Sequence, residues 1–471
     1  MSRKRKPLPI IENLEIESVA AEGNALGRHE GAVVFVPFCA PGDVVDVQVL
    51  KKRKNYMEGR ITAFRKQGEN HLAPRCKHFG VCGGCAWQHL PYELQLKYKR
   101  QQVVDCMERI AKVEIPEIAP TLPSEHIWQY RNKMEYAFSN KKWLTQEQLD
   151  SGDKFDNRDG AGFHISGAFD KVLDISECHL PCGPGNEIRN YAKELARELG
   201  MSFYDIRAQK GGIRNIMVRS VSTGHTMVLV QFGEDARDSA HAFLTRLADR
   251  FPEINSLYYV INPKVNDTFV DLELSLFRGE PFIEEEMEGL RFRIGPKSFY
   301  QTNSAQAYRL YSVARDMAGL TGNELVYDLY TGTGTIANFV ARSAAKVIGI
   351  EYVEDAVADA RVNSAANGIS NTEFFAGDMK DVLSDGFIAE HGRPDVMIID
   401  PPRAGMHTDV VDTVMRAEPR VIVYVSCNPA TQARDIALMD SKYRVEAVQP
   451  VDMFPHTAHV ENVVRLVLRQ D

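Results

Sequence analysis

Short apolar runs alternate with helical patterns through the last third of the chain. The runs LVYDL, VIGI, TEFFAG, VMIID and VIVYVS recur at the spacing of βα units, and VENVVRLVLR closes the series. They are apolar on both faces, which is typical of buried strands in a parallel sheet. We therefore expect a doubly wound α/β domain over residues 289–471, with its ligand site beyond the carboxyl ends of the strands. Polar residues stand at these ends: Tyr330, Glu351, Asp378, Asp400 and Cys427.

Residues 325–351 predict a nucleotide-type cofactor cradle. An apolar strand pattern ends at Asp328, a loop with Gly332 and Gly334 follows, and after a helical pattern the next strand ends at Glu351. The glycines let the backbone approach a ligand, and the acid can accept hydrogen bonds from ribose hydroxyls. The loop also fits the G-x-G-x-x-A form of dinucleotide sites. S-adenosylmethionine, NAD and a purely structural βαβ unit are therefore the alternatives.

The N-terminal segment reads as short strands separated by turns. LEIESVA, AVVFVPF, DVVDVQVLKKR and EGRITAF are β-rich, with glycines and Pro41-Gly42 between them. Several short strands in so short a segment predict a small OB-like β-barrel over residues 1–66. Residues 51–54 are all basic and give the barrel one basic edge. The barrel is thus a candidate for nucleic-acid binding, with a structural accessory as the alternative.

Residues 67–288 are expected to form a central α+β domain. Residues 92–112 have a helical pattern, YRNKMEYAFS and FHISGAFDKVLDI look like strands, and GGIRNIMVRSV with HTMVLVQFG looks like a hairpin. A polar loop is predicted at residues 149–162 and a linker near residues 284–288. Beyond the linker, Thr302 or Asn303 is a suitable N-cap for a helix.

Composition narrows the class of protein. The chain has 471 residues and a net charge of -8, which argues against a uniformly basic nucleic-acid binder but leaves room for local basic patches. No apolar run approaches the roughly 20 residues of a membrane helix, and no secretory signal follows the basic N-terminus MSRKRKPLP. Eight cysteines without an export signal indicate a reducing, cytoplasmic setting. We expect a monomer.

A tight cysteine cluster, C-x5-C-x2-C, lies at Cys76, Cys82 and Cys85. Glycines between the last two thiols suit a backbone that wraps around a metal, and the intervening residues are not typical of a core. Zinc would normally show paired C-x2-C motifs, so one cluster with a remote fourth ligand favours a [4Fe–4S] site. The candidates for that fourth ligand are Cys178, Cys182, His78, His89 and His179.

Cys427, in the segment SCNP, stands at the tip of a predicted strand, where a buried structural cysteine has no reason to be. A thiol beside a methyl donor makes sense if the acceptor atom is a poor nucleophile, as C5 of uracil is. Addition of a thiolate to C6 makes C5 nucleophilic, and a general base must later remove the C5 proton. The candidate bases are His456, His459 and Glu461.

Taken together and in order, these motifs resemble the RNA (uracil-5-)-methyltransferases that modify 23S ribosomal RNA. The resemblance covers nearly the whole chain. It rests on the TRAM-like barrel stretches EGNALGRHEGAVVFVP and PGDVVDVQV, the cysteine cluster, YRNK, DISECHL, SFYQTN, DLYTGTGT, DPPRAG, SCNP and HTAHVENV. It implies an RNA-binding TRAM barrel, a central domain with an iron–sulfur site and a C-terminal class I S-adenosylmethionine-dependent methyltransferase domain. The implied partner is structured RNA.

The resemblance also implies residue roles. Cys427 becomes the nucleophile and Glu461 the proton acceptor, with both histidines as framework. S-adenosylmethionine is implied to lie among Gln301, Tyr330, Thr335, Glu351, Asp378 and Asp400, and a [4Fe–4S] cluster among Cys76, Cys82, Cys85 and Cys178. The family often reads D-L-[FY]-C-G-x-G-N, whereas this chain has Thr331 and Thr335 in place of the cysteine and the asparagine. Thr335 can still form a hydrogen bond.

Two other interpretations stay open from the sequence. One keeps the chemistry but takes tRNA as the substrate; members acting on tRNA generally lack the cysteine cluster and the barrel. The other is an iron–sulfur RNA-binding protein with a non-catalytic methyltransferase fold, against which Cys427, Glu461 and Asp400 argue.

Overall fold

The computed structural model describes residues 8–155 and 157–470, so most of the basic N-terminus MSRKRKPLP lies outside the described residues. The chain forms two compact units, each built from several stretches of sequence. One unit contains residues 1–124, 402–405 and 426–464. The other contains residues 125–401, 406–425 and 465–471.

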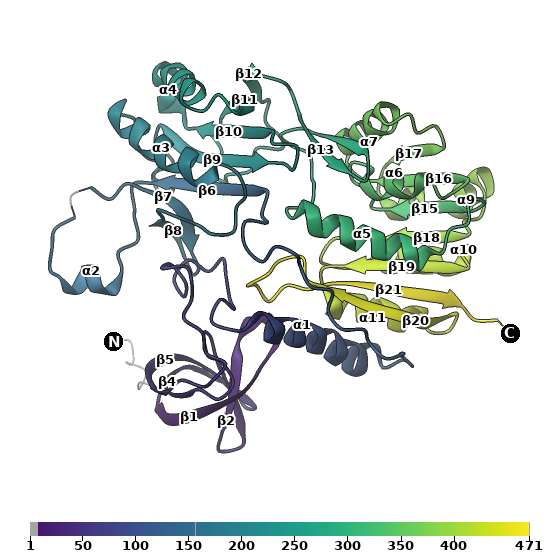
Figure 1. Cartoon of the computed structure of the whole chain (residues 1–471), viewed down its shortest axis with the longest axis horizontal. Coiled ribbons are helices and arrows are strands. Elements are labelled where there is room, and N and C mark those ends of the chain that lie inside the picture. The colour runs from purple at the N-terminus through teal and green to yellow at the C-terminus, as the bar shows by residue number, and fades with distance from the viewer. Residues whose placement is uncertain (1–7, 156, 471) are drawn as a thin grey trace, which may run out of the picture. The chain divides into compact units, whose positions relative to one another are not determined.

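A closed five-stranded barrel begins the first unit, as the sequence predicts (Figure 1). Its strand order is β1-β2-β3-β5-β4; β3 and β5 are parallel, and the pairs β1–β2, β1–β4, β2–β3 and β4–β5 are antiparallel. Alternate residues such as Val34, Val45 and Val47 fill the interior. The strands are β1 (Ile10–Val19), β2 (Ala25–His29), β3 (Ala32–Val36), β4 (Val44–Lys52) and β5 (Tyr56–Lys66).

The predicted helix after the cysteine cluster is confirmed as α1 (Tyr92–Cys106), which continues as a π-helical turn, η2 (Met107–Ala111). It ends at Lys112, whose φ of 56° is left-handed. The fully buried residues of α1 include Gln95 and Lys99, so this helix contributes polar groups to the interior of the unit.

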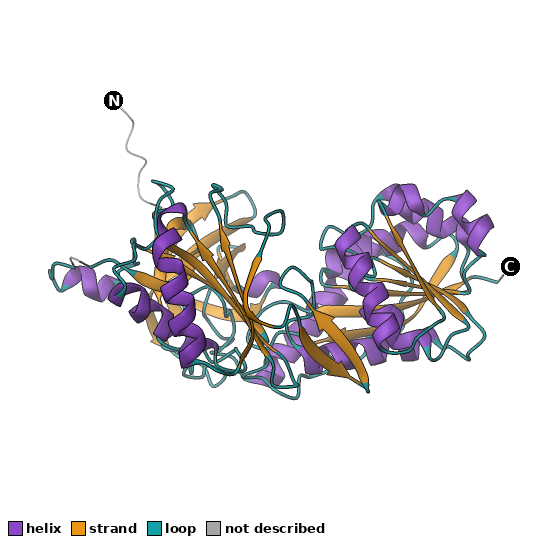
Figure 2. Cartoon of the chain, turned by 90° about the horizontal axis from the view of Figure 1, so that it is seen from above, coloured by secondary structure: helices purple, strands orange, loops and turns teal. Residues whose placement is uncertain are grey.

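A seven-stranded sheet of order β12-β11-β10-β9-β6-β7-β8 opens the second unit. The helices α3 (Gly185–Glu198) and α4 (Arg237–Arg250) cover the same face of it (Figures 1 and 2). The predicted β9–β10 hairpin is confirmed. The segment FHISGAFDKVLDI is a hairpin rather than one strand, because Gly167 turns the chain at a φ of 78°. The strands are β6 (Lys133–Ser139), β7 (Gly160–Ile165), β8 (Ala168–Asp174), β9 (Ile213–Ser220), β10 (Thr226–Phe232), β11 (Ile254–Ile261) and β12 (Ser275–Gly279). A short helix, α2 (Gln146–Asp150), overlaps the start of the predicted polar loop.

The predicted linker near residues 284–288 is wrong, because this stretch is a strand. β13 (Ile283–Met287) pairs with β14 (Leu290–Ile294) in a two-stranded sheet. Ile283, Glu285 and Met287 point inward alternately, and Glu285 is fully buried. Its carboxylate accepts hydrogen bonds from the hydroxyls of Ser222 and Ser304. A run of three glutamates is usually exposed to solvent; here the two hydroxyls and the backbone N–H groups of Ser222 and Glu286 satisfy the buried carboxylate of Glu285.

The C-terminal sheet has seven strands in the order β17-β16-β15-β18-β19-β21-β20. The pairs β17–β16, β16–β15, β15–β18 and β18–β19 are parallel, and helices lie on both sides of the sheet (Figure 2). This confirms the doubly wound expectation. The strands are β15 (Leu325–Leu329), β16 (Lys346–Glu351), β17 (Thr372–Ala376), β18 (Val396–Ile399), β19 (Val421–Ser426), β20 (Tyr443–Val451) and β21 (Glu461–Leu468). The helices are α5 (Ser304–Ala318), α6 (Thr335–Ala341), α7 (Glu354–Ala366), α8 (Met379–Val382), α9 (Asp385–His391), α10 (Thr408–Ala417) and α11 (Pro429–Met439). Within the described residues, every helix is too short or too polar to span a membrane.

Candidate active site

The loop between β15 and α6 has the shape that a cofactor cradle requires. Tyr330 has a left-handed φ of 65°, and its N–H donates to the carbonyl of Ile350 at 3.0 Å. Gly334 caps α6 at a φ of 74°. A Cβ at this glycine would lie 2.8 Å from the Cβ of Ala360, so a side chain has no room there. The loop is therefore fixed between two parallel strands with its backbone close to their ends.

Glu351 is bound into the same loop. One carboxylate oxygen, Oε2, accepts the N–H of Gly332 at 3.0 Å, and the other, Oε1, accepts the N–H of Val353 at 3.0 Å. Each carboxylate oxygen has a second lone pair, so the half-buried side chain can still accept hydrogen bonds from two hydroxyls. This geometry suits a ribose diol.

A second carboxylate, Asp328, lies beneath the loop. It is fully buried and accepts a hydrogen bond from the Thr331 hydroxyl at 2.5 Å. Burial raises the pKa of Asp328 to about 7; the bond from Thr331 opposes the rise and the charge of Asp400 adds to it. Burial likewise raises the pKa of Asp400 to about 7. Two carboxyl groups whose ionisation is tuned near neutrality thus border this end of the sheet.

Gln301 approaches the same group from the start of α5. Its side chain hydrogen-bonds Tyr311, a fully buried residue whose pKa is raised well above its ordinary value by burial and by the charge of Asp400. The carbonyl of Gln301 accepts a hydrogen bond from Asn132 Nδ2 at 2.9 Å. Asn303 caps the helix, which confirms one of the two predicted caps. The segments YRNK and SFYQTN are therefore joined.

Thr335 and Asp378 have local partners. Thr335 is buried, and its hydroxyl lies 3.4 Å from that of Thr333. Asp378 caps α8 by accepting the N–H of Lys380 at 3.2 Å. Asp378 lies two residues after the end of β17, near the strand end where the sequence predicts it, whereas Thr335 is the first residue of α6. Contact of either residue with a cofactor remains a prediction.

Cys427 and Glu461 belong to the first unit. Cys427 follows β19 directly and is half-buried. Asn428 caps α11 and donates from Nδ2 to the carbonyl of Arg403 at 3.1 Å. The hydroxyl of Thr431 donates to the same carbonyl at 3.2 Å. The loop RAG is therefore fastened to the segment SCNP, which contains Cys427.

Glu461 is the first residue of β21 and is 6% exposed. The neighbouring amide of Asn462 donates to Gln432 Oε1 at 2.7 Å, and Gln432 Nε2 donates to the carbonyl of Asn462 at 3.1 Å, which ties β21 to α11. At its other end β21 meets the start of β19, where the N–H of Leu468 donates to the carbonyl of Arg420. β21 thus runs antiparallel to β19, and its first residue lies at the edge where Cys427 follows β19.

The two candidate histidines differ in their surroundings. His456 is buried, with a left-handed φ of 66°. Its backbone N–H donates a hydrogen bond to Gln95 Oε1 at 2.8 Å. Gln95 Nε2 lies 3.3 Å from its ring Nδ1. His459 is exposed. His456 is thus part of a buried network with α1, which agrees with a framework role.

The cysteine loop is anchored to the same network. The N–H groups of Ala86 and Trp87, directly after Cys85, both donate to the carbonyl of His456, at 2.9 and 3.0 Å. The cluster thiols are half-buried, and the N–H of Cys82 donates to the carbonyl of His78 in a tight turn. Among the described residues, no group of three or more His, Cys, Asp or Glu side chains is arranged to hold a metal ion. The expected [4Fe–4S] site is therefore not confirmed.

The remaining cysteines of the cluster prediction lie in the second unit. The N–H of Cys178 donates to Asn186 Oδ1 at 2.9 Å, and Asn186 returns a bond of 2.9 Å to the carbonyl of Cys178. The Cys182 thiol donates to the carbonyl of Ser220 at 3.6 Å, and burial raises its pKa. The structure thus fixes the backbone of Cys178 and gives Cys182 a separate contact.

Sequence reasoning missed two groups that shape these sites. One is Tyr311, on the buried side of α5, whose hydroxyl bonds Gln301. The buried ion pair between Lys99 and Asp452 joins residues 353 positions apart. A lysine on the apolar side of a helical pattern is the one signal that could have revealed it.

Comparisons with known proteins agree with this architecture. The family model described as tRNA (Uracil-5-)-methyltransferase matches residues 280–469, and the TRAM domain model matches residues 11–62. An uncharacterized RNA methyltransferase of Porphyromonas gingivalis is 58% identical over 96% of this chain and 99% of its own length. One of Bacteroides thetaiotaomicron is 56% identical over 96% of this chain and 100% of its own.

A solved structure is similar over nearly the whole chain. The tRNA (uracil-54, C5)-methyltransferase of Pyrococcus abyssi, in complex with S-adenosyl-L-homocysteine, has a TM-score of 0.74 and 28% identity. The match covers 97% of this chain and 100% of that one. The chain therefore belongs to the S-adenosylmethionine-dependent RNA methyltransferases, in the family of RNA (uracil-5-)-methyltransferases that carry a TRAM domain.

Proposed function

We propose that the protein methylates C5 of a specific uridine in structured RNA, with 23S ribosomal RNA as the leading substrate. The observation that carries the proposal is the pairing of Cys427, half-buried directly after β19, with Glu461 at the adjoining end of β21. A thiol and a carboxyl group at one sheet edge supply the two functions that C5 methylation needs, a nucleophile and a base.

The proposed reaction begins with Cys427. Its sulfur, as the thiolate, forms a bond to C6 of uracil, and the electron pair of the C5–C6 double bond moves so that C5 becomes nucleophilic. Bound S-adenosylmethionine supplies an electrophilic methyl group. After C5 has taken that methyl, Glu461 removes the C5 proton, the C5–C6 double bond forms again and the sulfur of Cys427 leaves.

The methyl donor would be held by the cradle of the second unit. We assign it to Gln301, Tyr330, Thr335, Glu351, Asp378 and Asp400. The strongest support is at Glu351, whose two oxygens are oriented by the backbone and retain lone pairs for ribose hydroxyls. The left-handed Tyr330 and the crowded Gly334 keep the loop backbone near this position. Hydrogen bonds between Glu351 and ribose hydroxyls would also suit NAD, but the family uses S-adenosylmethionine.

Trapping with RNA that contains 5-fluorouridine tests the nucleophile and the base. Fluorine at C5 cannot leave as a proton, so the wild type should accumulate a covalent protein–RNA adduct that survives denaturing electrophoresis. Cys427→Ala should form none, whereas Cys106→Ala, at the end of α1 and half-buried like Cys427, serves as the matched cysteine control and should react normally. With ordinary uridine RNA, Glu461→Gln should accumulate a methylated adduct. A wild type without adduct excludes the nucleophile role, and rapid turnover by Glu461→Gln excludes the base role.

Transfer RNA is the second candidate substrate. The Pyrococcus abyssi enzyme, whose name specifies tRNA, matches 97% of this chain, so the barrel does not favour 23S ribosomal RNA by itself. Incorporation of labelled methyl groups into separately purified ribosomal RNA and tRNA, both from a strain that lacks the gene, decides between them. Methylation of tRNA alone would overturn the ribosomal assignment while leaving the chemistry intact.

We further propose that Cys76, Cys82, Cys85 and Cys178 bind a [4Fe–4S] cluster. Three thiols within ten residues, in a loop turned by backbone hydrogen bonds, have the donor chemistry that iron–sulfur clusters use. The four side chains are not gathered into a site among the described residues, so no step of the reaction is assigned to the cluster. Anaerobic purification followed by iron and sulfide analysis is the test. About four irons per chain support the proposal, and stoichiometric zinc contradicts it.

A further inference from the structure

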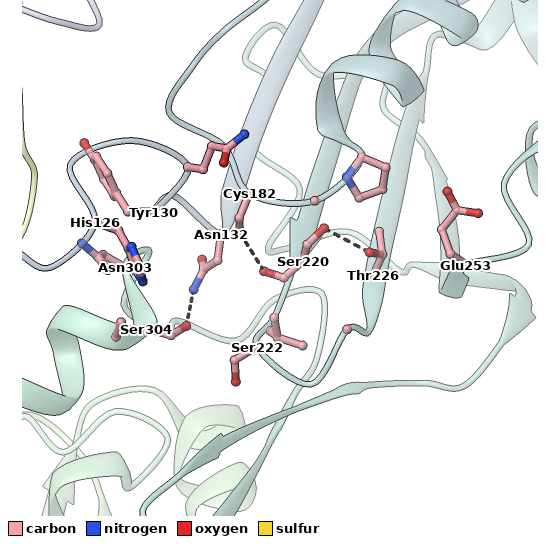
Figure 3. Close-up of a pocket in the computed structure, with 16 residues that line it drawn as sticks. His126, Tyr130, Asn132, Cys182, Ser220, Ser222, Thr226, Glu253, Asn303 and Ser304 are labelled. Atoms are coloured by element: carbon pink, nitrogen blue, oxygen red, sulfur yellow. Dashed lines mark hydrogen bonds between the residues drawn. The ribbon is translucent and has the colours of Figure 1, made fainter.

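A cavity in the second unit has no part in the chemistry described above. Its volume is about 540 Å³, within the range of small-molecule sites. It is lined by residues that precede β6, by residues 182–184, by the turn between β9 and β10, and by the first turn of α5. Figure 3 shows Asn132, Ser220, Thr226 and Ser304 around it, from segments far apart in the sequence.

The lining selects against a phosphate. Among the described residues that border the cavity there is no lysine or arginine, and Glu253 is an acid. The exposed lining is mainly carbon, with hydroxyl and amide groups at a few points. Tyr130 and His126 add aromatic rings. A neutral, flat and partly apolar ligand with hydrogen-bonding edges matches this chemistry, and an unstacked nucleobase is such a ligand.

Asn132 provides an independent sign of a ligand. It is 5% exposed, and its Nδ2 donates to the carbonyl of Gln301 at 2.9 Å and to Ser304 Oγ at 2.8 Å. Because a carbonyl only accepts, the amide orientation is fixed and Oδ1 is the remaining atom. Oδ1 is buried and accepts no hydrogen bond from the described part of the chain. A buried acceptor without a donor costs about 1–3 kcal/mol, and because Asn132 lines the cavity, a small rotation of its side chain would let Oδ1 meet a donor on a bound base.

Hydroxyl groups continue this polar edge. Ser220 Oγ and Thr226 Oγ1 lie 3.0 Å apart and share one hydrogen bond. Because each hydroxyl oxygen has two lone pairs, the two oxygens can still accept a hydrogen bond from an incoming N–H group. Gly183, at a φ of 68°, packs tightly behind them, since a Cβ there would lie 2.4 Å from Ser220 Oγ. The hydroxyl pair is therefore held in place rather than free to rotate away.

We propose that this cavity binds an extruded nucleobase, with its ribose, from a single-stranded part of the RNA substrate near the methylated uridine. The proposal rests on the proposed function. Asn132 connects the cavity with Gln301, which is assigned to the cofactor, and its N–H also donates to the carbonyl of Thr302 at 2.7 Å. An occupied cavity would thus stabilise the segment that begins α5. The RNA phosphates stay outside, because no cationic side chain of the lining meets them.

Filling the mouth of the cavity tests the proposal. Ala305 is exposed at the first turn of α5 and lines the cavity, so Ala305→Trp should block it. Asp316→Trp, exposed near the other end of α5 and outside the lining, is the matched control. With unmodified ribosomal RNA as substrate, we expect Ala305→Trp to raise the KM for RNA about tenfold or more. The affinity for S-adenosylmethionine, measured by calorimetry, and the melting temperature should match those of the control.

A crosslinking experiment supplies a readout that does not depend on turnover. A photoreactive benzophenone amino acid at position 305 of the full chain should crosslink to one or two neighbouring nucleotides of the same RNA, while the same group at position 316 should not. An unchanged KM for Ala305→Trp together with absent crosslinks at position 305 overturns the cavity assignment. If the wild type methylates no RNA at all, the proposed function itself fails, so the two failures are distinguishable.

Discussion

The buried ion pair between Lys99 and Asp452 yields the sharpest stability prediction. Lys99 Nζ lies 2.5 Å from Asp452 Oδ1, and both side chains are fully buried. Asp452 also accepts hydrogen bonds from the Tyr92 hydroxyl at 2.8 Å and from the N–H of Phe454 at 3.1 Å. Because both side chains are excluded from water, each charge depends on its partner, and burial lowers the pKa of Lys99.

The substitution Lys99→Met removes the ammonium group and keeps most of the volume of the side chain. Asp452 is then left as a buried charge with two neutral donors, and breaking such a pair costs about 3–5 kcal/mol of the free energy of unfolding. The exposed pair Lys51–Glu58, 2.7 Å apart with both side chains 43% exposed, is the comparison. Lys51→Met should cost far less, because exposed ion pairs contribute little to stability.

Trp87 provides the assay, because its buried ring lies 6.0 Å from the Lys99 ammonium. With Trp128 and Trp143 replaced by phenylalanine, urea unfolding followed by fluorescence reports this unit alone. Lys99→Met/Asp452→Asn, in which the buried charge is gone, should recover part of the loss. A Lys99→Met variant no less stable than Lys51→Met would refute the reasoning, as would a double variant less stable than the single one.

Three further predictions concern the cradle. Gly334→Ala should lower the affinity for S-adenosylmethionine at least tenfold in calorimetry, because a Cβ would lie 2.8 Å from that of Ala360 and a left-handed φ costs about 1–2 kcal/mol. Gly332→Ala, with open space around its Cβ, should lose less affinity. Equal losses in the two variants would contradict the packing argument. Glu351→Gln should weaken the same binding about tenfold, whereas the exposed Glu354→Gln should not. The folded pKa of Asp328, about 7, exceeds the unfolded value, so the folded state binds more protons and its free energy of unfolding should fall as pH rises from about 4 to about 7. Asp328→Asn should flatten this slope in denaturation at pH 5 and pH 7.5, and an unchanged slope would remove Asp328 as its source.

The sequence by itself determined the helices and strands and the positions of the reactive polar residues relative to them. Periodicity of apolar residues fixed the strands, because a strand buried on both faces must be apolar throughout. Polar residues directly after such strands then stand at one sheet edge, which is why Glu351, Asp400 and Cys427 could be expected at strand ends. The helix cap at Asn303 follows from equally local chemistry.

Only the tertiary structure decided which polar groups are buried together. Glu285 looked like part of a solvated linker, but hydroxyls of Ser222 and Ser304, far away in sequence, allow its burial in a strand. Lys99 meets Asp452 across 353 positions, and Asn132 meets Gln301 across 169. The energy of such contacts depends on the absence of water, and that is a property of packing rather than of any local pattern of residues.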